Sequence, residues 1–249
     1  MMTGFVHPVI MGGDAVSPRG VPVDPAERAG RILDAAARLL LRYGHDRTTI
    51  SDVAREAGVA KGSVYAHWRS RELLFLALLR REQAAVRAEV RDRLRAADRP
   101  ADLELLIAES VRAYQRNPLV AAVLTRNTDV LGDLARVTGD QRSPGSVVEL
   151  LVALRAGGWI RTDRSLAEQV TVLTSVYLGY FLTEPLLPGE FHVPDDAVPG
   201  LIAETVRRAL ERPEPLGPDE VAAVDRVVHD HIAAAAAAAE ERLSGEDRA

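Results

Sequence analysis

The chain has 249 residues, of which 47% are hydrophobic and 27% charged, an ordinary composition for a globular protein of one or two domains. It contains no cysteine, which excludes disulfides, thiolate nucleophiles, Cys-ligated zinc and iron–sulfur clusters. The net charge is −5, yet residues 26–80 carry ten Lys and Arg against six Asp and Glu. A basic block on an acidic chain suggests a local site for a polyanion.

The first segment, residues 1–23, contains glycines and prolines but no helical or strand period, and we expect a flexible tail there. It lacks the basic start and the continuous apolar run of a signal peptide. No apolar stretch approaches the roughly 20 residues that span a bilayer. We therefore expect a cytoplasmic protein, associated with the nucleoid if it binds DNA, that makes no membrane contact.

Helix signals begin directly after this tail. Asp24, Thr49 and Ser70 are side chains of the type that caps a helix start, and Gly44 and Gly58 are suited to helix ends. Apolar residues recur at spacings of three and four between these signals. The sequence predicts helices over 24–43, 49–58, 61–68 and 71–96, the last being long enough to connect two domains.

The second half of the chain also has a helical pattern. Pro100, Pro118 and Pro144 stand where a proline opens a helix, and Gly157 follows the last of these helices. A capping box at Ser165 opens a strongly apolar helix. Further helices are expected over 166–182, 199–210 and 218–242, with a Pro- and Gly-rich loop over 185–199. No alternation of apolar and polar residues predicts a strand, so the expected fold class is all-α.

One window has the pattern of a helix-turn-helix. Such a motif needs a small residue where its two helices cross, which Ala54 supplies, and a positive φ at the turn, which Gly58 adopts without strain. Val59 and Val64 are placed to hold the two helices together. The spacing Ala–x₃–Gly–Val–x₄–Val is moderately specific on its own.

The second helix of this window, residues 61–68, strengthens the interpretation. Only Val64 and Trp68 form an apolar side, so this helix would bury little as a structural element. A recognition helix, in contrast, must keep one face free for the major groove. Small residues on that face allow close approach, and Lys61, Tyr65 and His67 are donors suited to phosphate oxygens.

These stretches resemble the DNA-binding domain of the TetR family, over residues 31–36, 43–44, 48–54, 57–68 and 70–74. The resemblance covers about a fifth of the chain and is dense. Trp68 stands where the family usually has Phe, and Ala60 where Ser or Thr often caps the recognition helix. The resemblance implies a helix-turn-helix domain over 24–70, and places its DNA-contacting positions at Thr48, Thr49, Lys61, Gly62, Ser63, Tyr65, Ala66, His67 and Arg71.

The resemblance also implies a regulatory and dimerisation domain over 71–243. Family members are homodimers, and the corresponding interface would be formed by helices at about 166–182 and 199–210. A small-molecule effector would bind among the helices after Pro100 and change the spacing of the two recognition helices on a palindromic operator. Polar or aromatic candidates for effector contacts are Tyr114, Asn127, Thr128, Trp159, Tyr177, Tyr180 and Phe181. The helix at 218–242 exceeds the minimal family pattern.

Three alternatives remain open at this point. The protein could be a TetR-like DNA binder without a small-molecule ligand, controlled by a protein partner or acting constitutively, and its second domain would then have a filled core. It could be an enzyme built on a helical bundle, although no Glu-x-x-His pair, nucleophile–base set or phosphate loop is present. A purely structural helical module would leave the polar face of 61–67 unexplained. No cofactor or metal is predicted.

Overall fold

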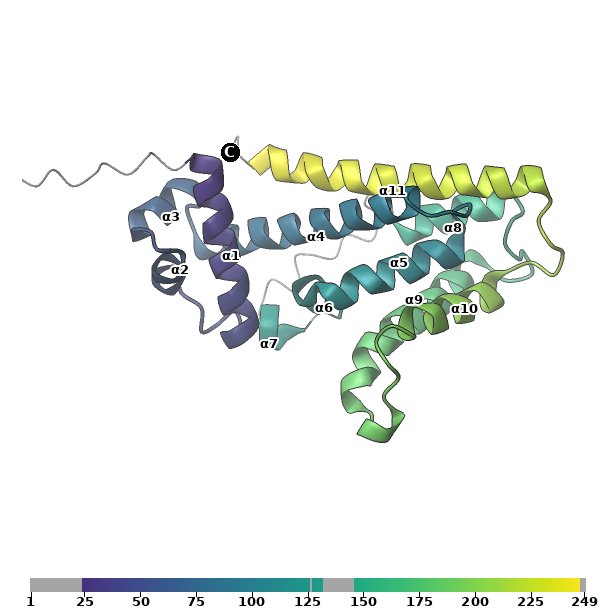
Figure 1. The fold of residues 1–249 in the computed structure, drawn as a ribbon, viewed down its shortest axis with the longest axis horizontal. Coiled ribbons are helices and arrows are strands. Elements are labelled where there is room, and N and C mark those ends of the chain that lie inside the picture. The colour runs from purple at the N-terminus through teal and green to yellow at the C-terminus, as the bar shows by residue number, and fades with distance from the viewer. Residues whose placement is uncertain (1–23, 126, 132–145, 247–249) are drawn as a thin grey trace, which may run out of the picture.

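The structure, a computed structural model, describes residues 24–125, 127–131 and 146–246. Most of them are helical, and the one β-type pairing among them is an isolated bridge between Ile160 and Glu211. The predicted all-α class is confirmed. Helices α1 to α3 form a small body at one end, and α4 runs from it into the larger body made by the remaining helices (Figure 1). The predicted tail at 1–23 lies outside the described residues.

The N-terminal body consists of three helices. Helix α1 (Pro25–Tyr43) starts at Asp24, whose side chain accepts a hydrogen bond from the Ala26 N–H, and ends at Gly44. Helix α2 (Ile50–Ala57) starts at the capping box predicted from Thr49. Helix α3 (Lys61–His67) follows after a short turn.

The larger body contains the helices that the prolines and caps delimit. These are α4 (Arg71–Arg95), α5 (Leu103–Arg116), α6 (Pro118–Leu124), the single turn α7 (Thr128–Leu131), α8 (Val147–Ala156), α9 (Leu166–Thr183), α10 (Val198–Leu210) and α11 (Pro218–Glu246). Two short 3₁₀ turns, η2 (Glu184–Leu186) and η3 (Gly189–Phe191), lie between α9 and α10. In Figure 1 this connection projects away from the body as a separate lobe.

Helix α11 lies along α4 over most of its length and runs in the opposite direction (Figure 1). Its buried positions are Val224, Val228, Ile232 and alanines of the alanine-rich segment. Alanine lets two helix axes approach closely, because its side chain adds little width. Near the N-terminal end of α11, the Asp225 side chain accepts a 2.7 Å hydrogen bond from the Ala101 N–H and so ties this end to the segment after α4. None of the described helices is long and apolar enough to cross a membrane.

Three predicted helix starts are wrong by one to three residues. Helix α5 begins at Leu103 rather than at Pro100, because Asp102 accepts a hydrogen bond from the Leu105 N–H and so satisfies a free donor of the first turn. Ser146 caps α8 in the same way, by accepting from the Glu149 N–H, so α8 begins at Val147, three residues after the predicted start. Pro144 itself lies outside the described residues. Helix α10 begins one residue before Pro199.

Two apolar cores organise the molecule, and α6 contributes to both. The first core joins α1, α2, α3 and the first half of α4, and it also includes Leu119, Ala122 and Leu131 from beyond the predicted domain boundary. The second core joins the other half of α4 to α5, α8, α9, α10 and α11 and includes Val120. Helix α6 therefore packs one face into each body.

Candidate nucleic-acid interface and interior cavity

The turn between α2 and α3 has the geometry that the sequence predicts. Gly58 is left-handed, with φ 66° and ψ 37°, and its N–H donates to the carbonyl of Ala54. The Val59 N–H also donates to the Ala54 carbonyl, at 3.0 Å. Val64 on α3 is fully buried in the first core. These contacts fix α3 across α2 as a helix-turn-helix and confirm that part of the prediction.

The other face of α3 is open to solvent. Lys61, Gly62, Tyr65 and Ala66 are exposed, and Tyr65 keeps 45% of its surface accessible. The Lys61 Nζ lies 5.8 Å from the centre of the Tyr65 ring, so the cation and the phenol share one patch. Ser63 and His67 are half-buried at its margins, the ring of His67 lying 5.3 Å from that of Trp68. Ala60 provides no side-chain cap.

The two neighbouring threonines have different surroundings. Thr49 is exposed, and its hydroxyl donates a 2.6 Å hydrogen bond to the Asp52 carboxylate. Thr48 is only 1% exposed, and its hydroxyl donates to the carbonyls of Gly44 and Leu39. Thr48 was predicted to contact DNA, but its burial does not fit that role, because its one hydroxyl proton is used inside the protein.

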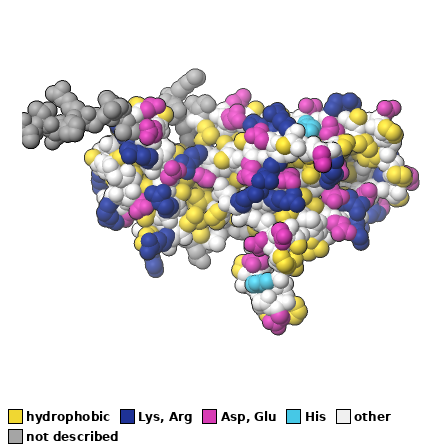
Figure 2. All heavy atoms as spheres, in the orientation of Figure 1, with side chains coloured by type: hydrophobic (Ala, Val, Ile, Leu, Met, Phe, Trp, Pro, Cys, Tyr) yellow, Lys and Arg dark blue, Asp and Glu magenta, His cyan; other side chains and the backbone are white. Residues whose placement is uncertain are grey.

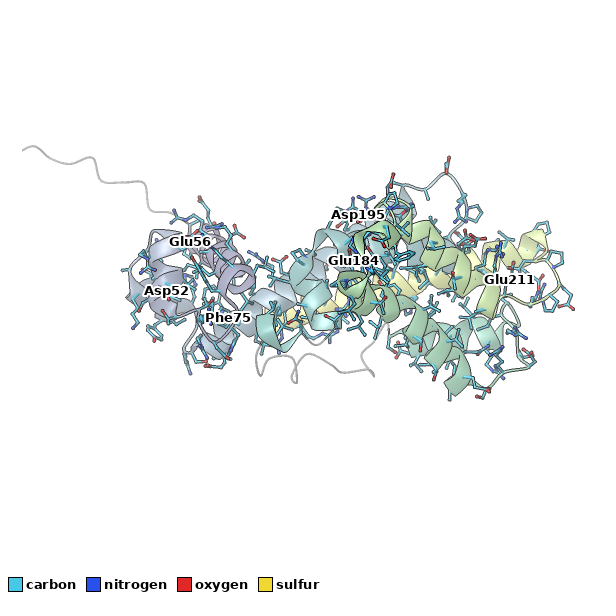
Figure 3. The ribbon with its side chains drawn as sticks, turned by 90° about the horizontal axis from the view of Figure 1, so that it is seen from below. Asp52, Glu56, Phe75, Glu184, Asp195 and Glu211 are labelled. Carbon is cyan, nitrogen blue, oxygen red and sulfur yellow. The ribbon has the colours of Figure 1, made fainter. Side chains whose placement is uncertain are left out.

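Acidic side chains on α2 are paired with arginines rather than left facing a polyanion. Asp52 lies 2.6 Å from Arg55, and Glu56 lies 2.9 Å from Arg38 on α1. Hydrogen bonds from Thr49 and Arg55 lower the pKa of Asp52, so its charge stays balanced by its neighbours. Figure 3 places Asp52 and Glu56 in the N-terminal body, at the opposite end of the molecule from Glu211.

Arg71 opens α4 beside this surface. Its Nη1 donates to the His45 carbonyl at 3.3 Å, and its Nε lies 3.4 Å from Glu72. Its side chain stays 30% exposed, so N–H groups remain accessible. Figure 2 shows Lys and Arg side chains distributed around the N-terminal body, with acidic groups among them.

A cavity of about 360 Å³, partly open to the surface, lies among the helices of the larger body. Its walls come from α4, α5, α6, α8, α9 and α11. Most of the lining is aliphatic, including Val86, Leu106, Val120 and Leu173. The polar members are fewer and reach in from five places: Gln83 and Arg87, Ser110 and Tyr114, Ser146, Thr174 and Tyr177, and His231. An apolar space with a few polar groups has the composition of a small-molecule site.

Comparison with known proteins identifies the family. The model of the tetR family of bacterial regulatory proteins matches residues 32–78. An uncharacterised HTH-type transcriptional regulator of Mycobacterium bovis is 33% identical over 159 residues, which are 60% of this chain and 79% of that protein. This chain belongs to the TetR family.

Other relatives of this TetR-family regulator are also transcriptional regulators rather than enzymes. The repressor KstR of Mycolicibacterium smegmatis is 33% identical over 101 residues, covering 40% of this chain and 50% of KstR. FadR from Bacillus subtilis, solved in complex with stearoyl-CoA, matches with a TM-score of 0.56 and 15% identity over 71% of this chain and 96% of that one. At that identity the likeness concerns the fold.

The structure brings only part of the predicted effector set to the cavity. Tyr114 and Tyr177 line it, with their rings edge to face at 5.9 Å, and Phe181 packs behind both. Three other residues lie elsewhere. Asn127 is exposed and accepts a bond from the Val130 N–H, Trp159 packs over Gly157, and Tyr180 packs on Phe181 outside the lining. The side chain of Thr128 lies outside what the structure describes.

Sequence reasoning missed Arg87, Ser110 and His231, which also line the cavity. Arg87 stands in an arginine-rich half of α4, where nothing in the sequence distinguishes an inward guanidinium from the outward ones. His231 is on α11, whose position against α4 has no local signal. Burial lowers the pKa of His231, opposed by Glu149, so the imidazole is uncharged near neutral pH.

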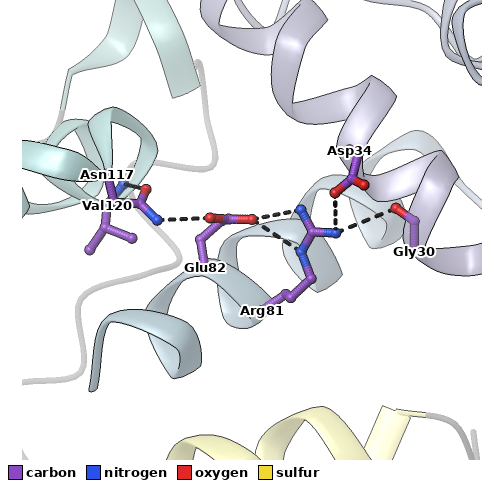
Figure 4. Close-up of polar contacts among 6 residues, drawn as sticks. All are labelled: Gly30, Asp34, Arg81, Glu82, Asn117 and Val120. Carbon is purple, nitrogen blue, oxygen red and sulfur yellow. Dashed lines mark hydrogen bonds and ion pairs between the residues drawn. The ribbon is translucent and has the colours of Figure 1, made fainter. Parts of the chain in front are cut away.

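A polar chain connects the cavity wall to the N-terminal body (Figure 4). Arg81 on α4 bonds to Asp34 on α1 at 2.8 Å, and to Glu82 at 2.6 Å. The other oxygen of Glu82 accepts a 2.7 Å bond from the Asn117 amide. Asn117 in turn caps α6 by accepting from the Val120 N–H. Because Val120 lines the cavity, an unbroken set of contacts joins the cavity to α1.

Proposed function

We propose that this TetR-family regulator represses transcription as a homodimer that binds a palindromic DNA operator and leaves it when a small molecule occupies the cavity. The observation that carries the proposal is that an outward α3 face and a cavity in the larger body occur in one chain and are joined through α4 and α6. The relatives that are named as repressors support repression rather than activation.

The proposed DNA contacts come from one surface. α3 would enter the major groove, with Lys61, Tyr65 and the small side chains of Gly62, Ser63 and Ala66 nearest the DNA. Thr49, His67 and Arg71 would contact the flanking phosphates. Support comes from the exposure of α3 and from the internal pairing of nearby carboxylates, which leaves the cations of this surface to attract phosphate.

The proposed dimer interface is formed by α9 and α10. Although α9 is strongly apolar, only Gln169 and Leu173 along it are buried within one subunit. Leu182 is 51% exposed and Leu201 on α10 is 54% exposed. Burying such a surface against a second copy would be favourable by roughly 25 cal/mol for each Å² of apolar area. The free apolar faces therefore favour a four-helix interface between two subunits.

The proposed response to ligand follows from the contacts of α6. A ligand that moves Val120 and its neighbours would also move Asn117, Glu82 and Arg81, and through them α1. The two recognition helices of a dimer must lie about 34 Å apart to enter successive major grooves. A small change in that separation would lower operator affinity. A DNA binder without a ligand would need no such cavity, and the open space favours the ligand-responsive alternative.

We expect Tyr65→Phe to weaken operator binding by at least about tenfold, because each subunit loses one hydrogen bond to a charged phosphate, worth about 1.5–3 kcal/mol. Tyr43→Phe is the matched control, since Tyr43 is equally exposed, at 47%, but lies at the far end of α1. Operator fragments and fluorescence anisotropy would measure both. The logarithm of the affinity should also fall linearly with the logarithm of salt concentration.

Equal affinities for the two tyrosine variants, or an affinity that does not depend on salt, would contradict the assignment of this surface. Circular dichroism and size-exclusion chromatography on the same samples would establish that each variant is folded and assembled as the unmodified protein is.

A further inference from the structure

We propose that the effector of this regulator is an amphipathic monoanion, with an apolar body inside the cavity and a carboxylate-type group on Arg87. The inference rests on the proposed function, since it specifies the chemical class of the ligand that would release the operator. It is drawn from the charge, the burial and the partners of the residues around the cavity.

The charged side chains that line the cavity are of one sign only, positive, among the described residues. Arg87 is a permanent cation, and no aspartate or glutamate is among the described residues that line the space. The rest of the lining is aliphatic, aromatic or neutral and polar. A cationic ligand would meet no counter-charge there, and a wholly apolar ligand would leave the guanidinium without a partner. The lining therefore favours a ligand with one negative group.

Arg87 differs from the other arginines around it on α4. Arg81 pairs with Asp34 and Glu82, Arg91 with Asp92 and Glu240, and Arg93 with Glu89. No hydrogen bond or ion pair joins Arg87 to any described residue. Burial lowers the pKa of its guanidinium, which reflects the cost of taking the charge out of water. Because Arg87 is half-buried and has no carboxylate partner among the described residues, an anion bound in the cavity would compensate its charge.

Two further features act in the same direction. The positive charge of Arg242 on α11 also lowers the pKa of Arg87, so an anion bound beside Arg87 would reduce this repulsion. Beside it, the buried Tyr177 hydroxyl lies close to Ser110, and Tyr114 is near enough to Arg87 for the two groups to affect each other's pKa. Both phenols can donate to a carboxylate.

The size of the cavity limits the anion. A volume of about 360 Å³ is at the lower end of the range for small-molecule sites, roughly 300–1,000 Å³. It suits a chain or ring system with a single small headgroup. A nucleotide-sized group would have to remain outside, and one guanidinium would leave most charges of a polyanion unmatched. A carboxylate, which a guanidinium can bind with two parallel hydrogen bonds, is the best match.

The test compares anions with neutral molecules of the same shape. Isothermal titration of the intact protein would measure binding of decanoate and 1-naphthoate against decanol and 1-naphthalenemethanol. We expect each carboxylate to bind at least about tenfold more tightly than its alcohol. In Arg87→Gln the preference should disappear, while Arg95→Gln, on the exposed side of the same helix, should retain it.

A second measurement needs no ligand. Arg87→Met keeps an unbranched apolar stem of similar reach but removes the unpaired charge, so the melting temperature of the free protein should rise by about 2–4 °C. Decanoate should raise the melting temperature of the unmodified protein and of Arg95→Met, but not that of Arg87→Met. If Arg87 instead has a structural role within the protein, Arg87→Met will melt lower than the unmodified protein, and the inference is overturned.

The outcomes separate this inference from the proposed function. Alcohols that bind as well as the carboxylates, or a charge preference that survives in Arg87→Gln, would overturn the anionic class but leave a ligand-released repressor intact. Failure of both carboxylates to bind would also overturn it. The proposed function fails separately, if the Tyr65 variant binds the operator as the Tyr43 variant does.

Discussion

At the scale of single residues, Gly58 has the most demanding backbone position of the helix-turn-helix. Its φ of 66° is one that L side chains adopt only with strain, and nothing lies within 4 Å of the position where a Cβ would stand. The need for glycine is therefore conformational and involves no clash. This is what allows the turn to be found in the sequence from the glycine and its apolar neighbours alone.

We expect Gly58→Ala to lower the free energy of unfolding by about 1–2 kcal/mol, because alanine is strained at a left-handed φ. Gly30→Ala provides a control of opposite sign. Gly30 lies within α1 and also has open space around it, so alanine there should raise stability by about 0.5–1 kcal/mol. Urea denaturation of the two variants measures both effects. Equal stabilities would show that the α2–α3 turn does not impose the positive φ.

Other residues could not be placed from the sequence. Thr48 and Thr49 are adjacent and identical in type, yet one is buried and the other exposed. The difference arises from the carbonyls of Gly44 and Leu39, which approach only after α1 has ended and the chain has turned. Arg87 has the same limitation. Its inward position depends on which face of α4 packs against α5 and α11. Because α4 contains many arginines, the sequence does not indicate which of them points inward.

At the scale of secondary-structure elements, side-chain caps predicted helix starts better than prolines did. Thr49, Ser70 and Ser165 each accept the expected bond from an N–H of the first turn. Pro100 was a wrong helix start because Asp102, two residues later, accepts a hydrogen bond from the Leu105 N–H. A proline can occupy the first turn of a helix, but it cannot satisfy such a free N–H. A proline tolerates the first turn of a helix, whereas a cap contributes directly to its stability.

The polar chain from α1 to α6 leads to a prediction about coupling. Glu82 accepts bonds from both Arg81 and Asn117, but a glutamine there has only one acceptor oxygen, so Glu82→Gln must lose one of the two. We expect operator affinity and decanoate affinity to change little when each is measured alone. The loss of operator affinity caused by saturating decanoate should shrink by about fivefold or more, which corresponds to about 1 kcal/mol of coupling.

Fluorescence anisotropy of a labelled operator, with and without decanoate, measures this coupling. Glu89→Gln is the control, because Glu89 also accepts from arginines, Arg93 and Arg116, but neither its carboxylate nor these two arginines bond to α1 or to the Asn117 side chain among the described residues. If the two variants respond to decanoate alike, the chain through Glu82 does not transmit the signal.

At the scale of the whole molecule, the free apolar faces of α9 and α10 predict the assembly. Leu201→Glu would place a carboxylate in the proposed interface, where removal from water without a partner is costly. We expect this variant to be monomeric at micromolar concentration and to keep the helix content of the unmodified protein, because Leu201 is exposed within one subunit. Val152→Glu on α8 has a similar exposure, 49%, outside that interface, and should remain dimeric.

Sedimentation equilibrium would distinguish these states. A Leu201→Glu protein that stays dimeric at the concentrations where Val152→Glu does would place the interface elsewhere. The long-range arrangement of the chain was the part least accessible to sequence reasoning. The final helix was predicted, but its contacts with α4 and with the segment that follows α4 join residues more than a hundred positions apart, and no local pattern encodes such contacts.

The two-sided packing of α6 has a consequence for engineering. Leu119, Ala122 and Leu131 complete the first core, although they come after α5 in the chain. The DNA-binding part is thus not a self-contained module that ends with α4. A chimera that joined residues 24–95 to an unrelated sensor would leave an apolar opening in the transplanted part. Exchanging sensors between regulators of this kind therefore requires grafting α6 and α7 together with the helix-turn-helix.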